Sequence, residues 1–360
     1  MENPLKLLHI IGLDPRQSDK YSTIKKVISF LIVLAVLLSA LIEFFLHHNE
    51  SQVYDTAPQS TVPNLQALLK MFALIIYKKE LIDLFTKGNH FWKLDKFGDC
   101  HKQKLTKLHK YVDLFFYVYA VIITGAFLQL ALLILIFEPG KPIFLCYGGL
   151  YGLESPQFEF YAVLDFLAIG VIAISVTAYD SIFFYFALYI YTEFKMIKIA
   201  FKRENCAQFI EAVKHHDFLL QYISKVNEVF SVIFLTQFFS GLLGICFNLF
   251  MISTQGTRDM KSFSTYFVGL VGYTAQSFTF CLIGELISEL SEDISNEIFY
   301  TDWLDDEVYR NTTARLIVMN RAQESPKLTI GKFADMNLRT FIIILRNAYS
   351  FLAFINEVLD

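Results

Sequence analysis

The chain has 360 residues, of which 54% are hydrophobic, 16% are aromatic and only 18% are charged. Soluble domains carry about 25% charged residues, so this composition excludes an ordinary soluble protein and indicates one that crosses a membrane several times. The net charge of −4 gives no basic field that would attract nucleic acid. The five cysteines are scattered without a CxxC pair, which indicates neither a disulfide framework nor a zinc site.

Seven stretches are apolar and long enough to cross a bilayer, which takes about 20 mostly apolar residues. The second is the weakest because it contains Pro63 and Lys70, and the fourth is too long for one crossing and is expected to continue into the cytosol. We therefore predict an all-α membrane protein that forms a single domain over residues 1–360. The predicted spans are 27–46, 60–77, 114–137, 159–190, 229–253, 263–288 and 336–357.

The segments outside these spans alternate in basic charge, and Lys and Arg mark the cytosolic side. Twenty-five of the 31 Lys and Arg residues fall in the N-terminal segment and every second loop after it, against three in the other loops. This bias predicts a cytosolic N-terminus and an extracellular C-terminus, the reverse of a G-protein-coupled receptor. Segments 195–228 and 289–335 then lie on the cytosolic side as an anchor region. Asn49, in an Asn-Glu-Ser sequon, lies outside and is a predicted glycosylation site.

Motifs for catalysis are absent from the sequence. It contains no GxGxxG, GxxxxGK[ST], HExxH or GxSxG. The pairs His47-His48 and His215-His216 are adjacent in sequence, so their side chains point to different sides of a helix and do not suit a metal. The sequence therefore predicts no enzyme activity, no cofactor and no bound metal.

Ionisable residues inside the spans are costly and need partners or a role. Asp165 and Asp180 both lie in the fourth span. Each suits a buried partner of a hydroxyl group or of Lys70. The alternative for Asp165 is a place in a ligand pocket.

The last predicted span carries Arg339 and Arg346, which are seven residues apart and share a helix face. The 11 residues 347–357 that follow extend only about 16 Å, too short to cross the hydrocarbon layer, so protein or water must shield the half with the arginines. One alternative is a helix that lines a water-filled pore. Phe354 would form an apolar constriction, and Asn356 and Glu357 would lie at the mouth, where acidic rings favour cations. The other is an ordinary packed seventh helix.

The last 80 residues resemble the insect odorant receptor family, in a stretch that begins CLIGELISELSEDISNEIFYTDWLDDEVYRN. The length, the seven spans and the orientation agree with the family over the whole chain. The residues that carry the likeness are Gly284, Glu285, Ser295 to Tyr300, Trp303, Arg315, Met319, Arg321, Gln323, Pro326, Gly331, Phe333, Leu338, Thr340, Phe341, Tyr349 and Ser350.

The resemblance implies an odorant-gated, non-selective cation channel in the plasma membrane of a sensory neuron. Such channels are tetramers in which a tuning subunit assembles with a shared co-receptor, and the seventh helix of each subunit lines the pore. The short segment 195–228 makes this chain resemble a tuning subunit, because the co-receptor has a large insertion there. The implied pore residues are Phe354, Ile355, Asn356 and Glu357, and those of the subunit anchor are Trp303, Arg339, Arg346 and Tyr349.

The resemblance also implies a pocket for a small volatile ligand in the outer half of the bundle, between the second, third, fourth and sixth spans. Such a pocket is expected to be aromatic with a few polar groups, and Gln129 is one candidate for a hydrogen bond. The other candidates are Met71, Phe127, Leu130, Ile134, Tyr161, Asp165, Phe166, Ile169, Tyr266, Tyr273 and Gln276.

Three alternatives compete with this interpretation. A gustatory-type homomeric channel is the nearest, although the helix motif typical of that family is incomplete here, since Asn347-Ala348 stands where Gln-Phe is expected. A G-protein-coupled receptor is disfavoured by the charge bias and by the missing Asp-Arg-Tyr and Asn-Pro-x-x-Tyr motifs. A transporter is disfavoured because no internal repeat is present.

Overall fold

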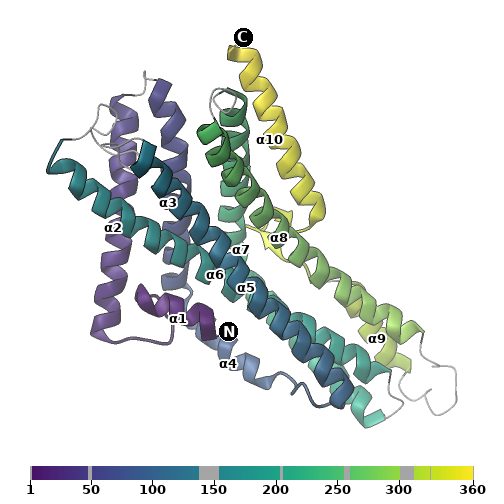
Figure 1. Cartoon of the computed structure of the whole chain (residues 1–360). Helices are drawn as coiled ribbons and strands as arrows, with labels where there is room; N and C mark the ends of the chain where they lie inside the picture. The colour runs from purple at the N-terminus through teal and green to yellow at the C-terminus, as the bar shows by residue number, and fades with distance from the viewer. Residues whose placement is uncertain are drawn as a thin grey trace.

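The computed structural model describes residues 2–47, 51–137, 154–202, 206–254, 260–300, 312–324 and 326–359. These residues are almost all helical, so the predicted all-α architecture is confirmed, with one antiparallel pair of two-residue strands added. The long helices form one bundle, and the C-terminal helix rises along one side of it (Figure 1). The elements are α1 (Glu2–Ile10), α2 (Lys20–Leu46), α3 (Ser51–Ile76), α4 (Lys78–Lys87), η1 (Gly88–His90), α5 (Asp99–Phe137), α6 (Gln157–Phe201), α7 (Cys206–Thr254), α8 (Met260–Phe299), α9 (Thr312–Gln323), β1 (Thr329–Ile330), β2 (Ala334–Asp335) and α10 (Leu338–Leu359).

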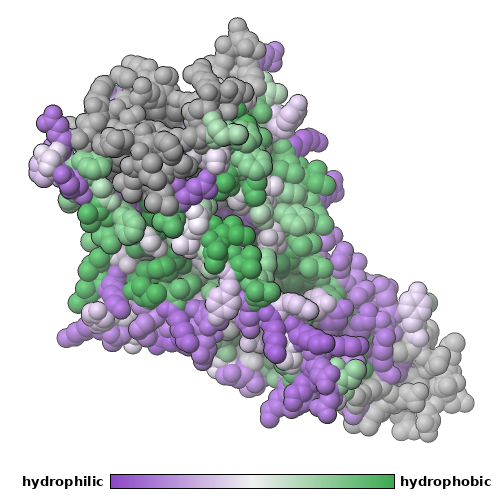
Figure 2. Space-filling view, in the orientation of Figure 1, coloured by the Kyte–Doolittle hydropathy of each residue, from purple (hydrophilic) through white to green (hydrophobic). Residues whose placement is uncertain are grey.

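Four of the helices are much longer than a bilayer is thick. Helices α5 to α8 have 39, 45, 49 and 40 residues, and a helix the length of α7 extends about 73 Å against about 30 Å of hydrocarbon. Their lower ends run together beside α9 in Figure 1, and Figure 2 shows hydrophilic residues over that region, below a broad hydrophobic band. The segments expected as spans and as cytosolic anchor thus merge into continuous helices.

Within the described residues, α2, α6, α7 and α8 are each long and apolar enough to cross a membrane. Helix α3 contains Pro58 and Pro63, and it also carries Lys70, whose side chain is fully buried. Polar groups inside a bilayer are tolerated where protein surrounds them. Neighbouring helices rather than lipid therefore surround Lys70.

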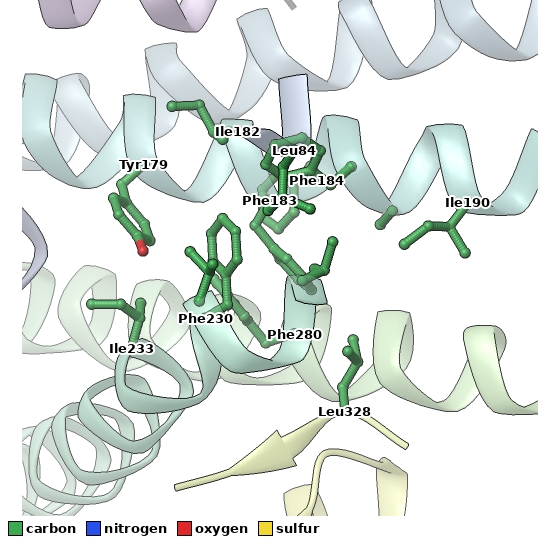
Figure 3. Close-up of a cluster of buried hydrophobic side chains, with 14 of the residues drawn as sticks. Leu84, Tyr179, Ile182, Phe183, Phe184, Ile190, Phe230, Ile233, Phe280 and Leu328 are labelled. Atoms are coloured by element: carbon green, nitrogen blue, oxygen red, sulfur yellow. The ribbon is translucent and has the colours of Figure 1, made fainter. Parts of the chain in front are cut away.

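Aromatic rings fill the centre of the bundle (Figure 3). The ring of Phe183 in α6 lies 4.9–5.5 Å from the rings of Phe230 and Phe234 in α7 and of Phe280 in α8. All four side chains are at most 2% exposed. Truncating one such ring to alanine costs roughly 3–5 kcal/mol in a packed core, so this cluster fixes α6, α7 and α8 relative to one another.

Helices α7 and α8 approach closely because each helix carries a glycine opposite a large side chain of the other helix. A Cβ atom on Gly244 in α7 would lie 2.6 Å from the ring of Tyr273 in α8. A Cβ on Gly269 in α8 would collide with the carboxamide of Asn248 in α7. The two glycines thus leave room between the helices for the phenol of Tyr273 and the amide of Asn248.

Candidate functional site

A cavity of about 150 Å³ lies between five helices, α3, α5, α6, α7 and α8. Most of its surface is apolar, with a few carboxamide and hydroxyl groups among the lining side chains. A mainly apolar cavity with a small number of directed polar groups is the usual form of a small-molecule site. The lining residues are Pro58, Gln59, Val62, Pro63, Gln66, Ile123, Ala126, Gln129, Val176, Gly244, Phe247, Asn248, Thr265, Val268, Gly269, Gly272, Tyr273 and Gln276.

A buried ion pair lies next to this cavity. Nζ of Lys70 in α3 is 2.5 Å from Oδ1 of Asp180 in α6, and both side chains are 0% exposed. The hydroxyl of Tyr119 in α5 and Nε2 of Gln276 in α8 each donate to Oδ2 of Asp180, both at 2.7 Å. Three donors from three helices therefore compensate one buried carboxylate, as a charge inside a membrane protein requires.

Gln66 of α3 connects this ion pair to α7. Its Nε2 donates to Oε1 of Gln237 at 2.8 Å and lies 3.5 Å from Oε1 of Gln276. Gln66 and Gln276 both line the cavity. A polar network that joins five helices thus reaches the cavity at these two carboxamides.

Two further carboxamides line the walls of the cavity. Nδ2 of Asn248 donates to the backbone carbonyl of Gly244 at 2.7 Å, and Nε2 of Gln129 donates to Oγ of Ser264 at 3.0 Å. Both amides are held by their NH2 groups. Their carbonyl oxygens accept no hydrogen bond from the described residues.

The structure brings three of the predicted ligand residues to the cavity, namely Gln129, Tyr273 and Gln276. Tyr266 lies behind it, with its ring centroid 6.1 Å from that of the lining residue Phe247. The side chains of Phe127, Leu130 and Ile134 lie outside the described part of the structure.

The other predicted ligand residues are not among the described residues that line the cavity. Met71 and Ile169 belong to the main hydrophobic core, and Asp165 is buried at 1% exposure. Tyr161 is half-buried, and Phe166 is 61% exposed. The fourth predicted span therefore contributes Val176 to the cavity lining. The four ligand residues that were predicted near the start of this span do not line the cavity.

Within the part of the chain that the structure describes, helix α10 packs on one side only. Ile344 and Ala348 are buried against Ile245 and Cys246 of α7, whereas the opposite side is exposed. The predicted residues Arg339, Arg346, Tyr349, Phe354 and Glu357 are all exposed along it. Trp303 and Asn49 lie outside the described residues, as do the side chains of Ile355 and Asn356.

The start of α10 is held by two neighbouring residues of α8, to which we gave no role from the sequence. Oε2 of Glu285 accepts a hydrogen bond from the backbone N–H of Leu338 at 3.2 Å. Gly284 lies so close to Met336 that an added Cβ would collide with its carbonyl oxygen. A carboxylate at a helix N-terminus stabilises it. Glu285 therefore fixes the first turn of α10 to α8.

Sequence reasoning also missed Gln66, Gln237 and Asn248. The signal that could have found them is the same in each case, a carboxamide inside an apolar span, where an unpaired polar group is costly. The predicted pocket did not include the fifth span, yet α7, which contains that span, contributes Gly244, Phe247 and Asn248 to the lining.

Known proteins share both the sequence pattern and the fold. Residues 55–349 match the sequence model of the 7tm Odorant receptor family. Odorant receptor 98a of Drosophila melanogaster is 21% identical over 71% of this chain and 65% of its own. Odorant receptor 85a of the same organism is 25% identical over 43% of this chain and 38% of its own. The matched region is therefore less than two thirds of the length of either relative. Odorant receptor 94a is 20% identical over 98% of this chain and 96% of its own.

The solved structure of the insect olfactory receptor OR5 from Machilis hrabei matches with a TM-score of 0.88 at 15% identity, over 99% of this chain and 97% of that chain. The same receptor in complex with eugenol matches with a TM-score of 0.85 at 16% identity. This likeness shows the seven-helix fold. Because the family match covers most of the sequence and the fold is shared, the chain belongs to the insect odorant receptor family.

Proposed function

We propose that this chain is the odorant-binding subunit of a ligand-gated, non-selective cation channel, and that the cavity between α3, α5, α6, α7 and α8 holds the ligand. The observation that carries the proposal is the cavity itself, which has mostly apolar walls and a few oriented amides. Eugenol, the ligand in the related OR5 complex, is also a small organic molecule. Tyr273, Gln276 and Gln129 are the proposed contacts among the residues that the sequence predicted.

Helix α10 is the proposed pore helix. Its exposed side carries Arg339 and Arg346 among apolar residues. Charged side chains that face lipid are costly, so protein or water is expected to cover this side. We expect other subunits to cover it in a tetramer with a shared co-receptor, with Phe354, Ile355, Asn356 and Glu357 at the pore. Trp303, Arg339, Arg346 and Tyr349 are the proposed anchor contacts. The exposed positions with large apolar side chains are Ile342, Ile343, Leu345, Tyr349, Phe351 and Phe354.

Two physical connections run from the cavity to α10. Helix α8 lines the cavity up to Gln276 and, two and a half turns later, holds the start of α10 through Glu285. Gln66 in the cavity bonds Gln237, which faces a small second cavity of about 10 Å³ that Ile344 of α10 also lines. A ligand that prefers one packing of α7 and α8 would thereby shift the position of α10 and the population of open pores.

Filling the cavity is expected to weaken ligand responses without loss of stability. Gly272 lines the cavity, and an added Cβ there meets no atom within 4 Å. The Gly272→Leu variant should raise the ligand concentration for half-maximal current at least ~10-fold, because the side chain occupies ligand space. Helix stability should not fall, since leucine is favoured over glycine by roughly 0.5–1 kcal/mol in a helix.

Gly170→Leu is the matched control for this variant. Gly170 in α6 also has open space around it but is exposed and does not line the cavity. Its dose–response curve should equal that of the wild type. Equal curves for both leucine variants, at equal surface amounts, would show that the ligand binds elsewhere.

The proposed orientation places the N-terminus in the cytosol, α10 ending outside, and the protein in the plasma membrane. On this orientation Asn49 is extracellular and Asn311, in the sequon Asn311-Thr312-Thr313, is cytosolic. The Asn49→Gln variant should therefore lose a glycan and migrate faster on a gel, while Asn311→Gln should migrate like the wild type. A change in gel mobility caused by Asn311→Gln alone would show that the orientation is the reverse of the proposed one.

A further inference from the structure

Five carboxamides line the cavity, and three of them use their NH2 groups to bind protein while their carbonyl oxygens stay available. Gln66 donates to Gln237, Gln129 donates to Ser264, and Asn248 donates to the backbone of Gly244. No described residue donates to any of the three carbonyl oxygens. The unused hydrogen-bonding capacity of the cavity is therefore weighted toward acceptors.

The orientation of Asn248 and of Gln276, which also lines the cavity, follows from partners that can only accept. Asn248 must turn its nitrogen toward the backbone carbonyl of Gly244. Gln276 must turn its nitrogen toward the carboxylate of Asp180, which leaves its Oε1 to face Nε2 of Gln66. Gln66 is oriented in turn, so its own Oε1 remains for another donor. The buried ion pair of Lys70 and Asp180 thus determines which amide atoms of the network donate and which accept hydrogen bonds at the cavity.

The size of the cavity limits what can occupy it. An engineered apolar cavity of about this volume in another protein binds benzene. The walls around the amides include Val62, Ile123, Val176 and Phe247. A single six-membered ring with one short substituent therefore matches the space and the apolar walls.

We propose that the preferred ligands of this cavity are small monocyclic molecules that carry a hydrogen-bond donor, namely alcohols or phenols, rather than ketones, aldehydes or esters of the same skeleton. A hydroxyl group can donate to Oδ1 of Asn248 or Oε1 of Gln66, whereas a ketone oxygen would face these oxygens without a proton between them. The inference rests on the proposal that this cavity is the odorant site.

The other polar groups of the cavity do not reverse this preference. The hydroxyls of Tyr273 and Thr265 and the carboxamide of Gln59 also line the cavity. Each can either donate or accept, so these groups serve both ligand classes. A site with oriented acceptors discriminates against a ligand without a donor, because the acceptors then stay unpaired. One net hydrogen bond corresponds to roughly 10-fold in affinity.

The test compares 1-phenylethanol with acetophenone, and cyclohexanol with cyclohexanone, on the purified full-length chain in detergent. Each pair has the same heavy-atom skeleton, and only the alcohol carries a hydrogen-bond donor. Apparent Kd values come from the concentration dependence of thermal stabilisation. We expect each alcohol to bind about 10-fold more tightly than its ketone. Equal or tighter binding of the ketones, or no binding of either alcohol, would overturn the inference, and this comparison requires no variant.

The Asn248→Ala variant tests which group accepts the hydrogen bond from the ligand hydroxyl, and Asn64→Ala is its matched control. Asn64 in α3 also donates its Nδ2 to the carbonyl four residues before it, Ser60, but does not line the cavity. The alcohol preference should fall below ~3-fold in Asn248→Ala and stay at about 10-fold in Asn64→Ala. A preference that is unchanged in both Asn248→Ala and Gln66→Leu would contradict the assignment.

Binding and current separate this inference from the proposed function. Tighter binding of alcohols in a protein that passes no current, alone or with a co-receptor, would leave the ligand class standing and overturn the channel. Currents evoked by the ketones at lower concentrations than by the alcohols would support the channel and overturn the ligand class.

Discussion

Replacing Lys70 with methionine is expected to lower the free energy of unfolding by about 4 kcal/mol, because breaking a buried ion pair leaves an uncompensated charge. The remaining donors to Asp180 are Tyr119 and Gln276, which are neutral. The loss would be measured as a shift of the unfolding transition of the purified protein in detergent. The double variant Lys70→Met/Asp180→Asn should recover at least half of it, because the amide oxygen still accepts both hydrogen bonds without a buried charge.

Lys87→Met provides the control for the Lys70 variant. Lys87 pairs with Asp83 in α4 at 2.9 Å, but both side chains are about half exposed, at 44% and 45%. Exposed pairs contribute roughly 0–1 kcal/mol, so this variant should unfold like the wild type. If Lys70→Met were equally harmless, the ion pair would not be holding α3 against α6.

Replacing Glu285 with alanine is expected to uncouple ligand binding from current. The variant removes the acceptor for the Leu338 N–H and with it the bond that fixes the first turn of α10 to α8. Coupling free energies between sites are typically 1–3 kcal/mol, and loss of a helix cap costs about 1 kcal/mol. We therefore expect the maximal ligand-evoked current to fall about 10-fold at equal surface amount. The apparent Kd of the ligand on the purified protein should not change.

Glu285→Gln separates coupling from charge at this position. Glutamine retains an oxygen that can accept from Leu338, so this variant should keep most of the current. Loss of current in Glu285→Gln as well would show that the carboxylate charge at the N-terminus of α10 is what matters. Wild-type currents in Glu285→Ala would remove Glu285 from the gating path.

The helices were predictable from the sequence because their main determinant is local. Long apolar runs can satisfy their backbone groups in a bilayer only as helices, and each predicted span lies within or nearly within one helix of the structure. The partner of Asp180 was among the alternatives for the same reason, because Lys70 is the one basic residue that the first six predicted spans contain and a buried carboxylate needs such a partner.

The cavity was less predictable because its lining depends on how far each helix slides and rotates against its neighbours. Tyr273 and Gln276 reach the cavity, whereas Tyr161 and Phe166 do not, although all four had a similar aromatic or polar character and a plausible depth. The close approach of α7 and α8 at Gly244 and Gly269 brings Asn248 to the wall. Such contacts between distant residues leave no periodic signal in either helix alone.

The most direct measurement is whole-cell current during application of a small-odorant panel to cells that express this chain alone or with an odorant co-receptor. The account predicts an odour-evoked cation current only when both are present, without G-protein signalling. Current from the chain alone would instead indicate a homomeric channel of the gustatory type and contradict the role of the co-receptor. Silence under both conditions, with the protein at the cell surface and the ligand bound to the purified chain, would contradict the channel itself.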